Sequence, residues 1–226
     1  MTLQVRALVF DVFGTVVDWY GSIVAEVART GLPVDGPAFA LAWRAGYEPA
    51  MQEVRSGALP WTSVDGLHRR ILDRLLAERG VTLPQAAAED LNRIWHRLAP
   101  WPDSVAGLAR LKTRYPVATL SNGNLSLLVA MARHAGLPWD AVLSAELFGH
   151  YKPDREVYLG AARLLDLAPQ QLLMVAAHPG DLRAAKACGL RTAFVPRPLE
   201  FGPGAAMEPW NEGEFDLVAR DIGELA

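Results

Sequence analysis

The feature that most constrains the fold is an alternation of short apolar runs with helical patterns. The runs, rich in β-branched residues, cover 3–10, 117–120, 172–177 and 192–195, with a weaker fifth at 141–146. Such runs are typical of strands that are covered on both faces. The helical patterns between them cover 103–114, 125–135, 155–166 and 182–188. The alternation predicts an α/β fold with a parallel sheet and helices on both faces.

One long segment, residues 20–99, interrupts this alternation. It contains only helical patterns, over 20–30, 37–56, 62–79 and 84–98. Their amphipathic spacing and their capping residues predict helices. We therefore expect a Rossmann-like core from residues 1–19 and 100–226, with a helical cap domain of residues 20–99 inserted after the first strand. The Pro- and Gly-rich tail, 197–210, is predicted to be an irregular surface segment.

The composition limits the classes of partner that the protein is expected to bind. The chain has 226 residues, with 22 basic and 25 acidic residues and a net charge of −3. Because the basic residues are scattered, no stripe for nucleic acid is expected. The apolar run around Asp11 is too short to span a membrane, and the single cysteine, Cys188, cannot form an internal disulfide. These features favour a cytoplasmic protein with a small-molecule partner and neither a nucleic acid nor a membrane partner.

Polar residues follow the predicted strands, where an open parallel sheet binds its ligands. They are Asp11, Thr15, Ser121, Asn122, Asn124, Lys152, His178 and Asp181. Taken singly, these residues have structural interpretations as helix caps, a solvated turn residue or a first-turn acid. Their occurrence at four strand ends, however, favours one active site.

Four motifs carry a family resemblance: DVFGT from Asp11, SNG from Ser121, KPDREVY from Lys152 and AAHPGD ending at Asp181. The sequence resembles the haloacid dehalogenase superfamily, and most closely its type II (S)-2-haloacid dehalogenases. The resemblance covers nearly the whole chain, including the helical cap. It implies a hydrolase that acts on carbon–halide bonds without a cofactor or a metal ion.

The resemblance also implies a mechanism. Asp11 would attack the α-carbon of a short 2-haloalkanoic acid, displace halide with inversion, and form an ester that water hydrolyses to the 2-hydroxy acid. Lys152 would keep Asp11 ionised. Asp181 would orient or deprotonate the water, while Ser121, Thr15 and backbone N–H groups would hold the substrate carboxylate.

The resemblance assigns the halide to Arg44 and Asn122. Taken alone, an arginine on a helix is ordinarily a solvated charge. Four aromatic residues are candidates for an apolar pocket wall: Phe13, Trp19, Trp43 and Trp61. Each could equally belong to the core, and for Trp43 the core is favoured. Tyr158 is expected to hydrogen-bond to a carboxylate in the site.

Phe13 bears on the rival activity, a Mg²⁺-dependent phosphatase. Phosphatases of the superfamily carry a second Asp at that position because an alkoxide leaving group needs a general acid, whereas a halide does not. They also usually place two acids in the fourth motif to help hold Mg²⁺, and here only Asp181 is present. The phosphatase remains an alternative, as does a non-catalytic binding protein on the same fold.

The fourth motif departs from the better-known dehalogenases. Ala176 and His178 stand where many members have Ser and Asn. His178 could act as a donor, shift the electrostatics of Asp11, or be a loop residue bonded to backbone. We hypothesise a small pocket that favours haloacetates, including fluoroacetate. Family members often form homodimers, although no residue pattern here identifies an interface. The remaining histidines, which show no metal-ligand spacing, are interpreted as structural: His68, His96, His134 and His150.

Overall fold

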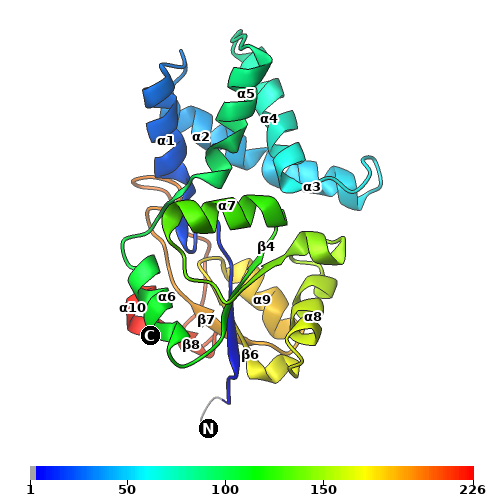
Figure 1. The fold of residues 1–226 in the computed structure, drawn as a ribbon, viewed down its shortest axis with the longest axis vertical. Helices are drawn as coiled ribbons and strands as arrows, with labels where there is room; N and C mark the ends of the chain where they lie inside the picture. Colours follow the sequence, from blue (N-terminus) through cyan, green and yellow to red (C-terminus); the bar gives the residue numbers. More distant parts are fainter. Residues whose placement is uncertain (1–3) are drawn as a thin grey trace.

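A six-stranded parallel sheet forms the centre of the protein (Figure 1). The structure is a computed structural model, and it describes residues 4–226. The strand order is β5-β4-β1-β6-β7-β8. The bounds are β1 Ala7–Phe10, β4 Val117–Ser121, β5 Ala141–Ser144, β6 Leu172–Ala176, β7 Arg191–Phe194 and β8 Leu217–Val218. The first strand begins at Ala7, later than predicted, because residues 4–6 are not in a strand, and Leu3 lies outside the described residues. The edge strand β8 was not predicted.

Helices cover both faces of the sheet. Along β1, Leu8 and Phe10 belong to the core under α6 (Ser104–Lys112), α7 (Leu125–Ala135) and α10 (Ile222–Leu225). Ala7 and Val9 point to the other face, under α8 (Arg155–Leu164) and α9 (Pro179–Ala187). Because successive side chains of a strand alternate between faces, a strand buried on both sides is apolar throughout. The predicted α/β fold is confirmed.

A layer of helices lies beyond one end of the sheet, at the top of Figure 1. It consists of α1 Trp19–Thr30, α2 Gly36–Ala45, α3 Tyr47–Arg55, α4 Val64–Glu78, α5 Gln85–Asn92 and the 3₁₀ helix η1 Arg93–His96. The chain enters this layer through β2 (Val17–Asp18) and leaves it through β3 (Ala99–Pro100). These two short strands pair antiparallel, with Val17 opposite Pro100. The pair was not predicted, because two residues are too few to give a strand pattern.

Three predicted helices have different bounds in the structure. The helix predicted over 37–56 is divided at Gly46 into α2 and α3. Pro49 has no N–H to donate to the carbonyl of Ala45, which weakens the helix at this point. A Cβ on Gly46 would lie 2.6 Å from Cγ2 of Ile71, so a glycine lets α4 pack closely here. The helix predicted over 84–98 ends at Asn92, and α9 begins at Pro179 rather than at 182.

Hydrogen bonds attach the helical layer to the loops at the end of the sheet. The amide nitrogen of Asn124 donates to Oδ2 of Asp65 at 2.9 Å, and the backbone N–H of Asp65 donates to Oδ1 of Asn124 at 3.1 Å. Arg55 donates from Nη2 to the carbonyl of Lys152 at 2.8 Å. The hydroxyl of Tyr151 donates to the carbonyl of Thr62. These bonds attach α3, the start of α4 and the loop between them to the loops that follow β4 and β5.

No helix within residues 4–226 is long and apolar enough to cross a membrane.

Candidate active site

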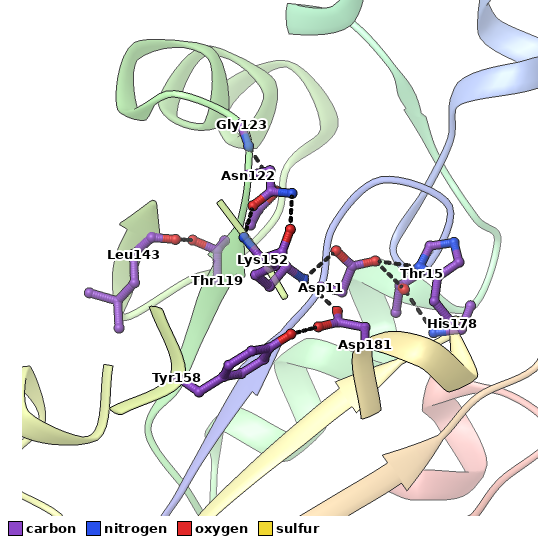
Figure 2. Close-up of polar contacts among 12 residues, drawn as sticks. Asp11, Thr15, Thr119, Asn122, Gly123, Leu143, Lys152, Tyr158, His178 and Asp181 are labelled. Atoms are coloured by element: carbon purple, nitrogen blue, oxygen red, sulfur yellow. Dashed lines mark hydrogen bonds and ion pairs between the residues drawn. The ribbon is translucent and has the colours of Figure 1, made fainter. Parts of the chain in front are cut away.

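Lys152 joins two carboxylates at the carboxyl end of the sheet (Figure 2). Asp11 follows the last residue of β1 and is 6 % exposed. Asp181 lies in the first turn of α9. Nζ of Lys152 donates to Oδ1 of Asp11 at 2.8 Å and to Oδ2 of Asp181 at 2.5 Å. Residues more than 140 positions apart in the sequence thus meet as one charged group.

This contact sets the charge state of Asp11. Burial alone would raise the pKa of the Asp11 carboxyl, but the charge of Lys152 and the hydrogen bond from His178 outweigh burial and hold that pKa well below its usual range. Burial would lower the pKa of Lys152, and the charges of Asp11 and Asp181 raise it instead. At neutral pH Asp11 is therefore an ionised carboxylate, the form that a nucleophile requires.

Tyr158, on α8, supports Asp181. Its hydroxyl donates to Oδ1 of Asp181 at 2.5 Å (Figure 2). Burial, reinforced by the charge of Asp181, raises the pKa of Tyr158, so the hydroxyl keeps its proton. Asp181 is thus held at one oxygen by Tyr158 and at the other by Lys152. Each oxygen retains a second lone pair that could accept from a water molecule.

The other oxygen of Asp11 faces Thr15 and His178. The Thr15 hydroxyl donates to Oδ2 of Asp11 at 2.7 Å, and Oγ1 of Thr15 accepts the backbone N–H of Ala177 at 2.9 Å. Nδ1 of His178 lies 3.1 Å from the same Oδ2. Thr15 is completely buried and uses its hydroxyl proton on Asp11, so it orients the carboxylate.

His178 lies between two carboxylates. Its Nε2 is 2.9 Å from Oε1 of Glu200, in the tail, and its Nδ1 contacts Asp11. Burial would lower the pKa of His178, but the charges and hydrogen bonds of Glu200 and Asp11 raise it to about 10. The ring is therefore an imidazolium at neutral pH. Glu200 was not predicted; its only sequence signal is that it is the one acid within the PLEFGP segment.

A cavity of about 350 Å³ opens beside these groups. Its lining residues come from both the sheet and the helical layer, and they are Asp11, Phe13, Arg44, Tyr47, Glu48, Met51, Asn122, Lys152, Pro153, His178, Gly180 and Asp181. The guanidinium carbon of Arg44 lies 4.9 Å from the ring centre of Tyr47 and 6.0 Å from that of Trp19. Within residues 4–226 no carboxylate pairs with Arg44. Arg44 thus lines the same cavity as the Asp11–Lys152 pair.

Asn122 and Ser121 have different surroundings. Oδ1 of Asn122 accepts the backbone N–H of Lys152 at 2.6 Å, while its amide donates to the Lys152 carbonyl at 3.3 Å and points its nitrogen toward the sulfur of Met51. Asn122 lines the cavity and also fixes the loop that carries Lys152. Ser121 is completely buried, and its hydroxyl accepts the backbone N–H of Gly123. Neither Ser121 nor Thr15 is among the residues that line the cavity, and their contact with a substrate carboxylate stays a prediction.

Of the four aromatic candidates for a pocket wall, Phe13 alone is among the residues that line this cavity. Phe13 lines the cavity, edge-on to Trp95 with ring centres 5.8 Å apart. Trp19 is buried and donates from Nε1 to Oε1 of Glu200 at 3.0 Å. Trp43 belongs to the core, the interpretation favoured for it. Trp61 is 39 % exposed and stacks on Tyr151 at a separate surface hollow, because the loop before α4 runs outside the cavity.

Sequence reasoning missed the apolar side chains that α3 and the following loops bring to the cavity. Tyr47 and Met51 lie one helical turn apart on α3, and Pro153 follows Lys152. The i, i+4 spacing of Tyr47 and Met51 in the sequence indicates a shared helix face, and the division of the helix at Gly46 turns that face toward Asp11.

The carboxylates of the site are poorly arranged for a divalent cation. Among residues 4–226, no group of three or more His, Cys, Asp or Glu is placed to hold a metal ion. The space between Asp11 and Asp181 is filled by the ammonium of Lys152, and Phe13 offers no oxygen ligand. An oxygen cage of the kind that Mg²⁺ prefers does not fit these residues.

A parallel sheet with helices on both faces, a buried Asp after its central strand and a helical layer above it define a class of α/β hydrolases. The chain belongs to the haloacid dehalogenase-like hydrolase family, whose family model matches residues 5–189.

Solved structures agree with this assignment. The L-2-haloacid dehalogenase PA0810 is 50 % identical, with a TM-score of 0.94 and coverage of 98 % of this chain and 97 % of that one. The defluorinating L-2-haloacid dehalogenase Rha0230 is 46 % identical, with a TM-score of 0.93 and coverage of 98 % and 93 %. The L-2-haloacid dehalogenase from Xanthobacter autotrophicus, with chloropropionic acid covalently bound, is 26 % identical, with a TM-score of 0.83 and coverage of 98 % and 96 %.

Proposed function

We propose that this protein hydrolyses the carbon–halogen bond of short (S)-2-haloalkanoic acids to give 2-hydroxy acids. The observation that carries the proposal is that one cavity is lined both by an ionised, lysine-bound Asp11 and by Arg44, which has no carboxylate partner among residues 4–226. A 2-haloalkanoate needs two such features: a carboxylate nucleophile at its α-carbon, and positive charge for its own carboxylate and its departing halide.

In the first step Asp11 attacks the α-carbon. A bond forms between a carboxylate oxygen and that carbon while the electron pair of the carbon–halogen bond leaves with the halide. Attack from the side opposite the halogen inverts the carbon, so an (S) substrate gives an (R) product. Arg44 and the amide of Asn122 are the cavity donors available to the halide. The covalent adduct in the Xanthobacter relative supports an ester intermediate.

In the second step water hydrolyses the Asp11 ester. Asp181 shares the ammonium of Lys152 with Asp11 and is also held by Tyr158. It accepts a proton from the water that attacks the carbonyl carbon of the ester. Because the attack is on Asp11 and not on the substrate carbon, the configuration set in the first step is kept.

The cavity favours small acids, including haloacetates. Phe13, Tyr47 and Met51 line the cavity of about 350 Å³ together with the charged side chains. A two-carbon acid needs the least apolar space beside these charged groups. Fluoroacetate belongs to this range, and the similarity to a defluorinating relative supports it.

A Mg²⁺-dependent phosphatase is the alternative activity. A phosphate ester needs a general acid for its alkoxide, and Phe13 supplies none. Lys152 also occupies the position between the carboxylates that a cation would take. Both observations favour a halide leaving group.

The test is halide release from chloroacetate, fluoroacetate and each enantiomer of 2-chloropropanoate in EDTA, with Asp11→Asn as the control. The proposal predicts release by the parent protein alone, preference for the (S) enantiomer, and an (R) product. Faster turnover of 2-chlorobutanoate than of chloroacetate would contradict the small pocket. Cleavage of p-nitrophenyl phosphate only when Mg²⁺ is added, without halide release, would identify a phosphatase.

A further inference from the structure

The two carboxylate oxygens of Asp11 have unequal surroundings. Oδ1 accepts one hydrogen bond, from Lys152, whereas Oδ2 accepts two, from Thr15 and His178. A carboxylate oxygen has two lone pairs in its plane. Oδ2 therefore has both of its lone pairs engaged, while Oδ1 keeps one that can attack a substrate. The unequal pattern indicates that Oδ1 becomes the ester oxygen and Oδ2 the ester carbonyl.

Glu200 fixes the donor that faces Oδ2. Its carboxylate is 4 % exposed, accepts from Trp19 Nε1 at 3.0 Å and lies 2.9 Å from Nε2 of His178. Gly14 makes room for it, because a Cβ at that position would lie 2.1 Å from Oε1 of Glu200. Gly14, which follows Phe13 in the first motif, thus leaves the space that the carboxylate of Glu200 occupies.

The segment that carries Glu200 is anchored to the same loop. Arg197 donates from Nε to the carbonyl of Thr15 at 3.0 Å and makes two hydrogen bonds, of 2.7 and 2.8 Å, to Asp103. Arg197 therefore attaches the tail to the loop of residues 11–15 three positions before Glu200. A buried carboxylate held in this way keeps the His178 ring at a fixed distance from Asp11.

We propose that the cationic ring of His178, held by Glu200, forms with the Thr15 hydroxyl the oxyanion hole in which the Asp11 ester is hydrolysed. The proposal rests on the proposed function. His178 is the catalytic residue, since it touches the reacting Oδ2, and Glu200 is a positioning residue. Glu200 lies beyond residues 5–189, the part matched by the family model.

Hydrolysis of the Asp11 ester begins with the attack of water on its carbonyl carbon. The water oxygen bonds to Cγ of Asp11, one water proton passes to Asp181, and the π electrons of the carbonyl move onto Oδ2. The negative Oδ2 is held by the Thr15 hydroxyl and by Nδ1–H of His178. When the carbonyl re-forms, the bond from Cγ to Oδ1 breaks, and the leaving alkoxide takes the proton from Asp181. Asp11 then ionises and releases one proton to solvent.

The charged groups around His178 determine how strongly Glu200 affects the pKa of its ring. Asp11 and Glu200 contact the ring, and Asp181 lies on the same helix, α9. Lys152 and Arg44 line the same cavity. Once Asp11 is an ester it is neutral, so Glu200 is then the only carboxylate in contact with the ring among the described residues. Removing the charge of Glu200 must lower the pKa of His178, most strongly in the ester state in which hydrolysis occurs.

The experiment separates the two steps in Glu200→Gln by rapid mixing with (S)-2-chloropropanoate, following chloride and lactate independently. We expect a burst of one equivalent of chloride at no less than the parent rate, followed by lactate release at least tenfold slower at pH 8. An Asp11 adduct should accumulate, detectable by mass spectrometry. Lowering the pH to 6 should restore lactate release, because the ring is protonated again. Glu208→Gln, which removes an exposed carboxylate from the same tail, is the matched control.

Other results would overturn the inference. Glu200→Gln with the kinetics of Glu208→Gln would show that Glu200 does not act. Equal loss of chloride and lactate at both pH values would show a merely structural role. In a His178→Asn background, Glu200→Gln should change the pH profile no further, since its effect passes through the ring. If Glu200→Gln does not fold, the ¹⁵N chemical shifts of His178 in the parent protein measure the protonation state of the ring instead. A neutral ring at pH 8 would overturn the proposal. Absence of chloride release by the parent protein would instead refute the proposed function.

Discussion

Nζ of Lys152 lies 2.8 Å from Oδ1 of Asp11, and less than a tenth of either side chain is exposed. An ion pair at this depth has lost most of its water, so each partner depends on the other for its charge. The same ammonium also binds Asp181. Lys152 therefore binds two buried carboxylates within one site and keeps Asp11 ionised.

Replacing this ammonium tests that dependence. In Lys152→Met, Asp11 and Asp181 lose their shared cation, and the pKa of Asp11 rises because burial is no longer opposed by Lys152. We expect halide release to fall by about 10²-fold or more. The free energy of unfolding should fall by about 3 kcal/mol, the usual cost of an unpaired buried charge. Lys112→Met, which breaks a half-exposed pair with Asp140, is the control and should leave the rate unchanged. Unaltered halide release in Lys152→Met would contradict the role.

Arg44 should require its planar guanidinium. Arg44→Lys keeps the charge but loses the stacking on Tyr47. We expect kcat/KM for 2-chloropropanoate to fall by about tenfold, corresponding to about 1.4 kcal/mol, and Arg44→Met to lose more. Steady-state kinetics measure both. Arg70→Lys, at an exposed position of α4, is the matched control. Equal activity of the Lys and Met variants would show that the charge of Arg44 is not used.

Asn124 should stabilise the contact between the helical layer and the sheet. Asn124→Ala removes its bonds to the backbone and side chain of Asp65 and to the hydroxyl of Ser126. Because this leaves buried polar groups unpaired, we expect the free energy of unfolding to fall by about 1–3 kcal/mol. Urea denaturation measures the change, with Asn211→Ala in the exposed tail as the control. A midpoint equal to that of the control would mean that the layer does not depend on this contact.

Gly14 should be required both for its backbone conformation and for the space it leaves. Its φ is +80°, and an added Cβ would meet the carboxylate of Glu200. Gly14→Ala should lower the free energy of unfolding by about 1–2 kcal/mol from backbone strain alone, and further from displacement of Glu200. In a Glu200→Ala background only the strain remains, so the cost of Gly14→Ala should shrink. Urea denaturation of the four proteins gives this coupling, and strictly additive effects would exclude the contact.

His178 should make the free energy of unfolding decrease as the pH becomes alkaline. Its pKa in the folded protein is raised to about 10, while an unfolded histidine titrates near about 6.5. A raised pKa stabilises the fold fully below the lower value, and this contribution is lost as the pH rises toward the higher one. Between these limits the free energy of unfolding should fall by about 1 kcal/mol per pH unit more in the parent than in His178→Asn. Parallel urea midpoints for the two proteins from about pH 7 to about pH 9.5 would contradict a protonated ring.

The sequence predicted the fold and the residues at the strand ends for one physical reason. Parallel strands that are buried on both faces must be apolar throughout, so a polar residue such as Asp11 or Lys152 stands out where the apolar run stops. Local pattern was sufficient there. The assignment of roles to Arg44 and Tyr158 came from the family resemblance rather than from the residues themselves.

The contacts that sequence did not predict are those between segments distant in the chain. Glu200 lies among Pro and Gly, a composition typical of exposed loops, and only folding brings it to His178. Trp61 has the composition of a pocket residue, but its loop places it on Tyr151. Periodicity alone did not show that the helix divides at Gly46, although Gly46 and Pro49 are local signals of a break. The close packing against Ile71 that the glycine allows is seen only in the structure.

The short β2–β3 pair brings the two ends of the helical insert together, with Val17 opposite Pro100. Because the two ends of the insert are adjacent, the insert constrains the flanking parts of the chain very little. The insert and the rest of the protein can therefore diverge independently. Here the insert supplies Arg44, Tyr47 and Met51, and the host supplies Asp11, Lys152 and Asp181. Transplanting the insert between relatives should therefore exchange substrate preference as a module while leaving the bond-breaking chemistry in place.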